Sequence, residues 1–230
     1  MYKRHKTFAF LYALILILNI YALVTQNQLL RMIAMPLIGT SLILYLLIKT
    51  KIEEQFHRLI FMGLVLSLAG DIQLLFTTGT EFYFLTGLIA TLIGYTLYSY
   101  AYFIDFTSDL SKTRTVGNVL LMVLLIVTVS FFIAAGKSLR EFTYPAIAYF
   151  LILSAMMVLS GYRHKRVNRL SFKLIFTGSF SFVISNLSIG YYNFIDAEHT
   201  MMIIFLFTYL IAQYLVVMGS IERKLFKNSK

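Results

Sequence analysis

The chain has 230 residues, of which 59% are hydrophobic and only 13% are charged, and its mean hydropathy is +0.80. Soluble domains average about 25% charged residues, and a fold of this size has too much surface to hide so many apolar side chains. The composition therefore excludes a soluble globular protein and predicts a polytopic membrane protein. The absence of cysteine excludes disulfides, thiolate metal ligands and a cysteine nucleophile.

Eight apolar windows are long enough to cross a bilayer, which takes roughly 20 residues of helix. The gaps between them are short and polar, so we expect an all-α fold, a bundle of eight transmembrane helices forming one domain over residues 1–230. The first window follows a basic leader, but its apolar run is longer than that of a signal peptide and no A-x-A pattern follows it. We therefore expect a retained first span. The predicted spans are approximately 7–25, 32–49, 59–76, 82–104, 116–135, 142–160, 172–194 and 201–221.

The basic residues alternate between the predicted loops in a way that sets the orientation. With the N-terminus inside, 17 of the 20 Lys and Arg residues fall in inner segments, and Arg31, Lys137 and Arg140 fall in outer ones. Such a bias is typical of cytoplasmic loops. Both termini are therefore predicted to lie inside, and the net charge of +10 is interpreted as a topology signal. We expect no nucleic-acid partner, since the loops account for the charge.

The two prolines of the chain occupy similar places in its two halves. Pro36 comes early in the second span and Pro145 comes early in the sixth. Both prolines are expected in a first helical turn, where the missing N–H would have no partner in any case. With four spans in each half, the pattern predicts two parallel repeats, residues 1–110 and 111–230.

Polar residues support the same repeat. Span three carries the pair Gly70-Asp71 and span seven carries Ser185-Asn186, each about two-thirds along an outward-running helix. Twenty-seven residues after Asp71 comes Tyr98, and the same step from Asn186 reaches Gln213. The halves therefore predict matching polar positions inside the bundle.

Asp71 is the only ionisable residue that the sequence places well inside a span. A charge at that depth is costly, and such residues usually mark a functional site. The alternative is a structural polar contact with Asn186, Gln73, Gln213 or nearby tyrosines. Gly63, Ser67 and Gly70 follow one stripe of the same helix, so Asp71 is expected to face other helices and not lipid.

Tyr95, Tyr98 and Tyr102 recur on one face of the fourth span. Packing and an interfacial position at the inner end explain Tyr102. Tyr95 is expected near mid-membrane, where its hydroxyl needs a partner. The four histidines lie in or beside connecting segments without metal-ligand spacing, so neither a metal site nor a cofactor is expected.

The order and spacing of these motifs resemble the YhhN-like lysoplasmalogenase family of eight-span membrane proteins. The resemblance runs from span two to the end of span eight. It rests on "MPL" at 35–37, "LSLAGDIQLLF" at 66–76, "FYFLTGL" at 82–88 followed by Tyr98, "YFLILSAM" at 149–156, "GSFSFVISNLSIGYYNF" at 178–194 and "YLIAQYLVVMG" at 209–219.

The resemblance implies hydrolysis of the vinyl ether bond of lysoplasmalogens, with a membrane lipid or lysolipid as the substrate. It assigns Asp71 as the general acid, with Asn186 orienting water and Tyr95 completing the catalytic set. The candidates for substrate binding are Tyr98, Gln213, Ser185 and Gln73. A bacterial cytoplasmic membrane is the expected location.

The chain departs from the family's usual pattern in three places. Asn186 stands where an aspartate is usual, Tyr95 where a histidine is usual, and Met35 where a lysine is frequent. These differences keep open an alternative function, a catalytically silent relative that binds or senses lipid. A small-molecule or proton-coupled transporter is a second alternative, because parallel repeats and one buried acid permit it.

Overall fold

Hydrocarbon offers peptide groups no hydrogen-bond partner, so an apolar run that crosses it satisfies its backbone by forming a helix. In the computed structural model, which describes residues 2–76 and 81–226, each predicted span overlaps one α-helix, and all eight helices are long and apolar enough to cross a membrane. The chain is therefore an integral multi-pass membrane protein, as predicted. The helices are α1 (Tyr2–Val24), α2 (Gln28–Thr50), α3 (Gln55–Leu75), α4 (Glu81–Thr107), α5 (Thr115–Leu139), α6 (Thr143–Tyr162), α7 (Arg169–Phe194) and α8 (His199–Ile221), and a 3-10 turn, η1 (Arg140–Phe142), precedes α6.

Several helices extend beyond their apolar windows because polar residues continue the helix at the level of the headgroups. α2 begins four residues early, where the side chain of Asn27 accepts a 3.0 Å hydrogen bond from the Leu30 N–H. This early start overturns one expectation. Pro36 lies eight residues after the start of α2, inside the helix and not in its first turn. Pro145 is the third residue of α6, in the first turn as expected.

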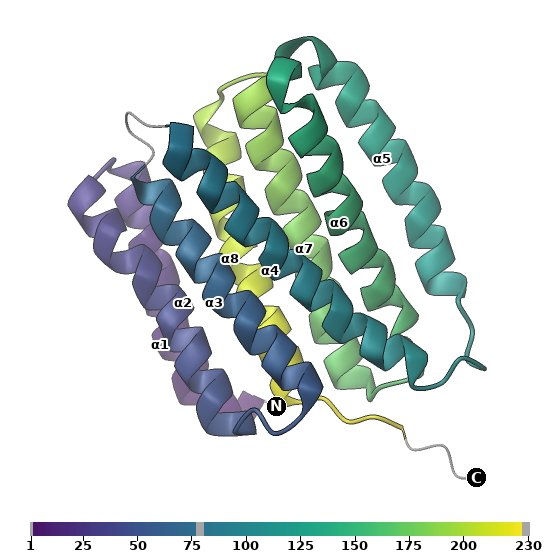
Figure 1. The fold of residues 1–230 in the computed structure, drawn as a ribbon. Helices are drawn as coiled ribbons and strands as arrows, with labels where there is room; N and C mark the ends of the chain where they lie inside the picture. Colours follow the sequence, from purple (N-terminus) through teal and green to yellow (C-terminus); the bar gives the residue numbers. More distant parts are fainter. Residues whose placement is uncertain (1, 77–80, 227–230) are drawn as a thin grey trace.

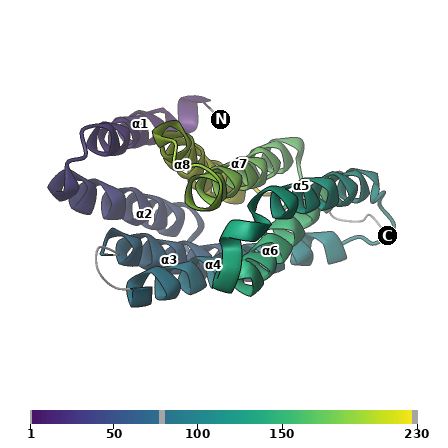
Figure 2. The same ribbon diagram turned by 90° about the horizontal axis from the view of Figure 1, so that it is seen from above.

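The eight helices form two rows. Seen from above, α2, α3, α4 and α6 lie along one side and α1, α8, α7 and α5 along the other (Figure 2). The start of α1 and the end of α8 lie at the same end, here called the inner end (Figure 1). The most extensive helix–helix contacts are those of α3 with α4 and of α7 with α8. Both pairs consist of helices that follow one another in the chain.

Glycines make the α3–α4 contact close. A methyl group built on Gly63 would lie 3.1 Å from the Gly94 carbonyl oxygen, and one on Gly70 would lie 2.8 Å from the Gly87 carbonyl oxygen. On α7, a methyl group on Gly178 would lie 3.1 Å from a carbonyl oxygen of α8. Small residues at these positions let the helix backbones approach closely, and Gly63 and Gly70 belong to the stripe noted in the sequence of span three.

An ion-pair network closes the inner end. Asp105, near the end of α4, is fully buried and accepts from Arg163 Nε at 2.8 Å and from Arg223 Nη2 at 2.6 Å. Arg163 also donates to Ser171 Oγ at 3.0 Å, and Arg223 pairs with Glu54. Asp105 is therefore a fully buried acid at the edge of the predicted fourth span, at the opposite end of the bundle from Asp71. The network joins the end of α4 to the segments that flank α7 and α8.

Candidate functional site

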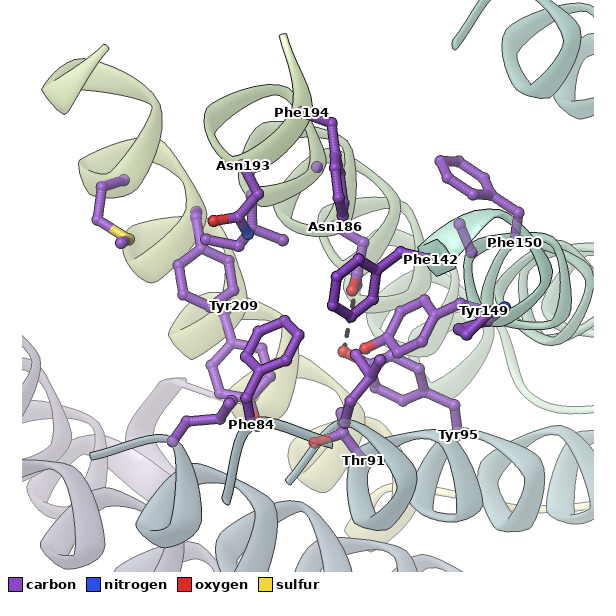
Figure 3. Close-up of a pocket in the computed structure, with 18 of the residues that line it drawn as sticks. Phe84, Thr91, Tyr95, Phe142, Tyr149, Phe150, Asn186, Asn193, Phe194 and Tyr209 are labelled. Carbon is purple, nitrogen blue, oxygen red and sulfur yellow. Dashed lines mark hydrogen bonds between the residues drawn. The ribbon is translucent and has the colours of Figure 1, made fainter. Parts of the chain in front are cut away.

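A cavity of about 360 Å³ lies toward the outer end of the bundle, within the size range of small-ligand sites. Side chains from every helix except α1 line it, and Figure 3 shows most of them. The apolar lining residues are Leu74, Phe84, Leu88, Phe131, Phe142, Pro145, Ala146, Phe150, Ile189, Gly190, Phe194, Met202 and Phe205. The polar lining residues are Arg31, Asp71, Thr91, Tyr95, Tyr149, Asn186, Asn193 and Tyr209.

Asp71 reaches this cavity from α3. It lies four residues before the helix ends at Leu75, so its Cα is about 6 Å from the outer end of the helix. The apolar window had placed it two-thirds along the span, but α3 begins at Gln55, which moves Asp71 relatively closer to the outer end. Tyr209 of α8 donates a 3.0 Å hydrogen bond to Asp71 Oδ2. Among the described residues no other hydrogen bond to this carboxyl group occurs, so Oδ1 is available to a ligand.

Asn186 and Tyr95 meet at the floor of the same cavity. The Asn186 amide donates to the Tyr95 hydroxyl at 3.2 Å and to the carbonyl oxygen of Phe182, one turn back, at 2.8 Å. Figure 3 shows the first of these bonds, with Tyr149 pointing toward the same place. The Tyr95 ring packs edge-on against Phe182 at 5.0 Å and against Tyr149 at 5.9 Å. These contacts fix the Tyr95 hydroxyl and leave the Asn186 Oδ1 atom as an acceptor.

Tyr98 and Gln213 lie behind the cavity wall and connect to Asp71 through Tyr209. The Tyr98 hydroxyl donates to Gln213 Oε1 at 3.0 Å, and Gln213 Nε2 donates to the Tyr209 hydroxyl at 3.0 Å. Tyr209 then donates to Asp71, so four side chains of α3, α4 and α8 form one chain of hydrogen bonds. Tyr98 and Gln213, two of the four residues predicted to bind substrate, are not among the residues that line the cavity.

Ser185 and Gln73 also lie away from the cavity lining. Ser185 is fully buried and donates to the Phe205 carbonyl oxygen at 3.1 Å, so it joins α7 to α8. The Gln73 Oε1 atom is buried and has no hydrogen-bond partner within the described part of the chain. Of the seven candidate residues, the structure thus brings Asp71, Asn186 and Tyr95 together around one cavity.

Five polar lining residues, Arg31, Thr91, Tyr149, Asn193 and Tyr209, were not singled out from the sequence. Tyr209 is four residues before Gln213, and this helical spacing puts both on one face of α8, which was a usable signal. Tyr149 and Asn193 lie in segments that carried the family resemblance but were not given roles. Arg31 was counted only as an outer-loop charge.

The chemistry of the lining is that of proton transfer and hydrogen bonding. One carboxyl group, one guanidinium group, one hydroxyl group, three phenols and two amides face an apolar wall that includes six phenylalanine rings. No cluster of three or more His, Asp or Glu side chains placed to hold a metal ion occurs in residues 2–76 and 81–226. A positioned acid in an apolar enclosure is suited to protonating an apolar substrate, because water does not compete for the proton.

Comparison with known proteins gives one match. The sequence model of the YhhN family matches residues 26–220, which include every residue that lines the cavity. No curated protein matches the chain, and no solved structure does.

Proposed function

The chain belongs to the YhhN family, and from this membership we propose that it is a lysoplasmalogenase-like membrane hydrolase. The proposed reaction cleaves the vinyl ether bond of a lysoplasmalogen to a fatty aldehyde and a glycerophospho-base. The observation that carries the proposal is the placement of Asp71. Its carboxyl group faces an aromatic-walled cavity and is held through one oxygen by Tyr209.

A vinyl ether is stable to base but hydrolyses once its β-carbon is protonated. In the proposed mechanism Asp71 gives its proton to that carbon, and the electron pair of the double bond forms the new C–H bond. The ether oxygen then shares the positive charge of an oxocarbenium ion, which the new Asp71 carboxylate stabilises. Water adds to the cationic carbon and returns a proton to Asp71. The hemiacetal then collapses: its hydroxyl group loses a proton as the aldehyde C=O bond forms, the bond to the glycerol oxygen breaks, and that oxygen takes up a proton and leaves as an alcohol.

Asn186 and Tyr95 are the proposed partners of the attacking water. The Asn186 Oδ1 atom is available to accept a hydrogen bond from water, while its amide nitrogen donates to the Tyr95 hydroxyl and the helix backbone. This arrangement orients water but cannot remove its proton, because neither group is basic near neutral pH. Asp71 is therefore assigned both proton transfers.

A substrate panel tests the reaction. Purified protein in lipid nanodiscs is given vinyl-ether, ester and saturated alkyl-ether lysolipids with the same headgroup, and fatty aldehyde is measured. We expect aldehyde from the vinyl ether only. The ester and the saturated alkyl ether have no carbon–carbon double bond beside the oxygen, so Asp71 has no carbon to protonate in them. Fatty acid release from the ester, without aldehyde, would replace the proposal with a lysophospholipase.

A lipid-binding role without catalysis is the second candidate, and the Asn186–Tyr95 contact is the observation that favours it. Two neutral side chains occupy the place where the family usually has an acid and a histidine. The double variant Asn186→Asp with Tyr95→His tests this role. Aldehyde release by the double variant alone would show that the natural chain binds lipid without hydrolysing it.

For location we propose a bacterial cytoplasmic membrane with both ends of the chain inside and the cavity toward the outer side. The lack of cysteine makes this testable, because a single introduced cysteine reports its own side of the membrane. Arg140→Cys should react with a membrane-impermeant thiol reagent in intact cells, and Lys51→Cys only after lysis. The reverse labelling pattern would show that the orientation of the chain is opposite to the one proposed.

A further inference from the structure

The cavity contains one basic side chain. Among the described residues that line it, Arg31 is the only Lys, Arg or His, and Asp71 is the only acid. Arg31 lies three residues after the start of α2, and its side chain is partly exposed. It was introduced above only as part of the charge bias of the loops, and the proposed mechanism gives it no task.

Arg31 has unused hydrogen-bonding capacity. Its side chain makes no ion pair and no hydrogen bond with any residue in the described part of the chain. The buried arginines of the inner end differ in this respect. Arg163 and Arg223 both pair with Asp105, and Arg166 donates to backbone carbonyl groups. A guanidinium at the wall of a cavity, with five donors and no partner among the described residues, is available to an anionic ligand.

The two charged side chains of the cavity come from neighbouring helices on one side of it, and the rest of the lining is uncharged. Arg31, Asp71 and Tyr209 come from α2, α3 and α8, which lie away from α5 and α6 in the bundle (Figure 2). The opposite wall carries Phe131 and Phe150 from α5 and α6, and Figure 3 shows Phe150 across the cavity from Tyr209. An amphiphile with an anionic end and a hydrocarbon end matches this division.

We propose that Arg31 binds the phosphate of a lysophospholipid headgroup and so determines which lipids occupy the cavity. A guanidinium matches a phosphate through two parallel hydrogen bonds, which an amine or an amide does not provide. The hydrocarbon chain then lies against the phenylalanine wall. The inference rests on the proposed function only for the reaction that the bound lipid then undergoes.

The depths of the two charged residues agree with this assignment. Arg31 is about 4.5 Å and Asp71 about 6 Å from the outer ends of their helices, at a rise of about 1.5 Å per residue. α2 and α3 are neighbours. A lysolipid phosphate on Arg31 would therefore hold its glycerol and the attached ether oxygen at the end of the cavity that also carries Asp71. Arg31 would act as a specificity-determining residue for the reaction.

The test uses ligands that cannot be hydrolysed. Equilibrium binding of a saturated 1-O-alkyl-glycerophosphoethanolamine is compared with binding of the same 1-O-alkyl-glycerol without phosphate, in nanodiscs. Wild-type protein should bind the phospholipid more tightly. Arg31→Gln should weaken that binding by about 10- to 100-fold, the range for a lost charged hydrogen bond, and leave alkylglycerol binding unchanged. Unchanged alkylglycerol binding also shows that the variant is folded.

Arg140→Gln is the matched control, because Arg140 is an exposed arginine at the same end that does not line the cavity. It should change neither affinity. The proposal is overturned if Arg31→Gln weakens both ligands equally, if it weakens neither, or if the wild type does not prefer the phospholipid. A further arm competes the bound lipid with inorganic phosphate. Displacement at concentrations as low as those of the lipid would assign the subsite to free phosphate.

These measurements are independent of catalysis. A protein that releases no aldehyde but shows the Arg31 effect keeps the phosphate subsite and loses the hydrolase function. A protein that releases aldehyde without the Arg31 effect keeps the hydrolase function and loses the subsite.

Discussion

At the scale of single residues, the question is how an apolar helix tolerates Asp71. Two features answer it. The carboxyl group lies near the outer end of α3 and faces a cavity, so it is not enclosed by hydrocarbon. It also accepts a hydrogen bond from Tyr209, which Gln213 and Tyr98 hold in place. Neutral donors orient the acid without pairing it with a positive charge, which suits a group that has to carry a proton.

Replacing Tyr209 by Phe tests this positioning. The change removes the donor to Asp71 Oδ2 and leaves Gln213 Nε2 without its partner. We expect kcat for aldehyde release to fall about 10-fold with little change in KM, and the unfolding free energy to fall by about 1 kcal/mol. Steady-state kinetics and thermal unfolding measure the two effects.

The matched control is Tyr12→Phe. Tyr12 is also buried, and its hydroxyl donates to the Leu210 carbonyl oxygen at 2.7 Å, outside the cavity lining. It should lose similar stability and keep its kcat. Equal losses of activity in the two variants would mean that Tyr209 acts only through the fold.

The sequence revealed some of these residues and hid others for physical reasons. Asp71 and Asn186 interrupt apolar runs, where their desolvation cost makes them conspicuous. Tyr209 and Tyr149 were not conspicuous, because placing tyrosine in a membrane helix costs little free energy. The hydrogen-bond partner of a tyrosine on another helix also cannot be identified from the sequence of one helix. Arg31 looked like any charge near a helix end, and only the packing of seven helices shows that it lines a cavity.

At the scale of helices, the site depends on how closely α3 and α4 approach. A methyl group on Gly70 would lie 2.5 Å from Thr91 Oγ1 and 2.8 Å from the Gly87 carbonyl oxygen. Gly70 precedes Asp71, and Thr91 is one turn from Tyr95. The spacing between the two helices therefore sets the distance between the acid and the phenol across the cavity.

Gly70→Ala should push the two helices apart. We expect a loss of about 1–3 kcal/mol in unfolding free energy, as for an overpacked core, because a backbone carbonyl cannot rotate away as a side chain can. Aldehyde release should fall as well, since Asp71 moves with its helix. Gly136→Ala is the control, because among the described residues no atom outside the surrounding turns of α5 lies within 4 Å of the added methyl group. A Gly70→Ala protein as stable and active as the wild type would show that this contact does not position the site.

Helix type and order were predictable from apolar runs, but helix ends were not. Polar residues at the headgroup level carry no hydrophobic signal, so the early starts of α2 and α3 were missed. The error had a consequence for Pro36, which lies in the interior of α2 and not in its first turn. Neighbouring helices make such a proline tolerable in a membrane protein.

At the scale of the whole molecule, the two ends of the bundle contain different features. The outer end holds the cavity, and the inner end holds the buried network of Asp105, Arg163 and Arg223. Arg163 and Arg223 were counted among the basic residues of the inner loops, yet both form ion pairs with Asp105 inside the protein. The network fastens the first half of the chain to the second at the end away from the cavity.

Asp105→Asn should therefore destabilise the whole bundle. Two buried guanidinium groups would lose their shared carboxylate, and removing one partner of a buried ion pair costs about 3–5 kcal/mol. Glu54→Gln is the contrast, because Glu54 pairs with Arg223 but its side chain is 59% exposed. Its loss should cost less than about 1 kcal/mol. Thermal unfolding in detergent compares the two variants. Similar melting temperatures would contradict the claim that the ion pairs of Asp105 stabilise the bundle.

The most direct test of the central claim is aldehyde release by Asp71→Asn. The variant keeps the size of the side chain and an acceptor for Tyr209 but has no proton to give. A general acid contributes about 10²- to 10⁴-fold, so aldehyde release from a vinyl-ether lysolipid should fall by at least about 100-fold at unchanged melting temperature. Asp196→Asn, the same change at an exposed residue of the outer end, should leave the rate unaltered. Near-wild-type aldehyde release by Asp71→Asn would contradict the assignment of Asp71 as the proton donor.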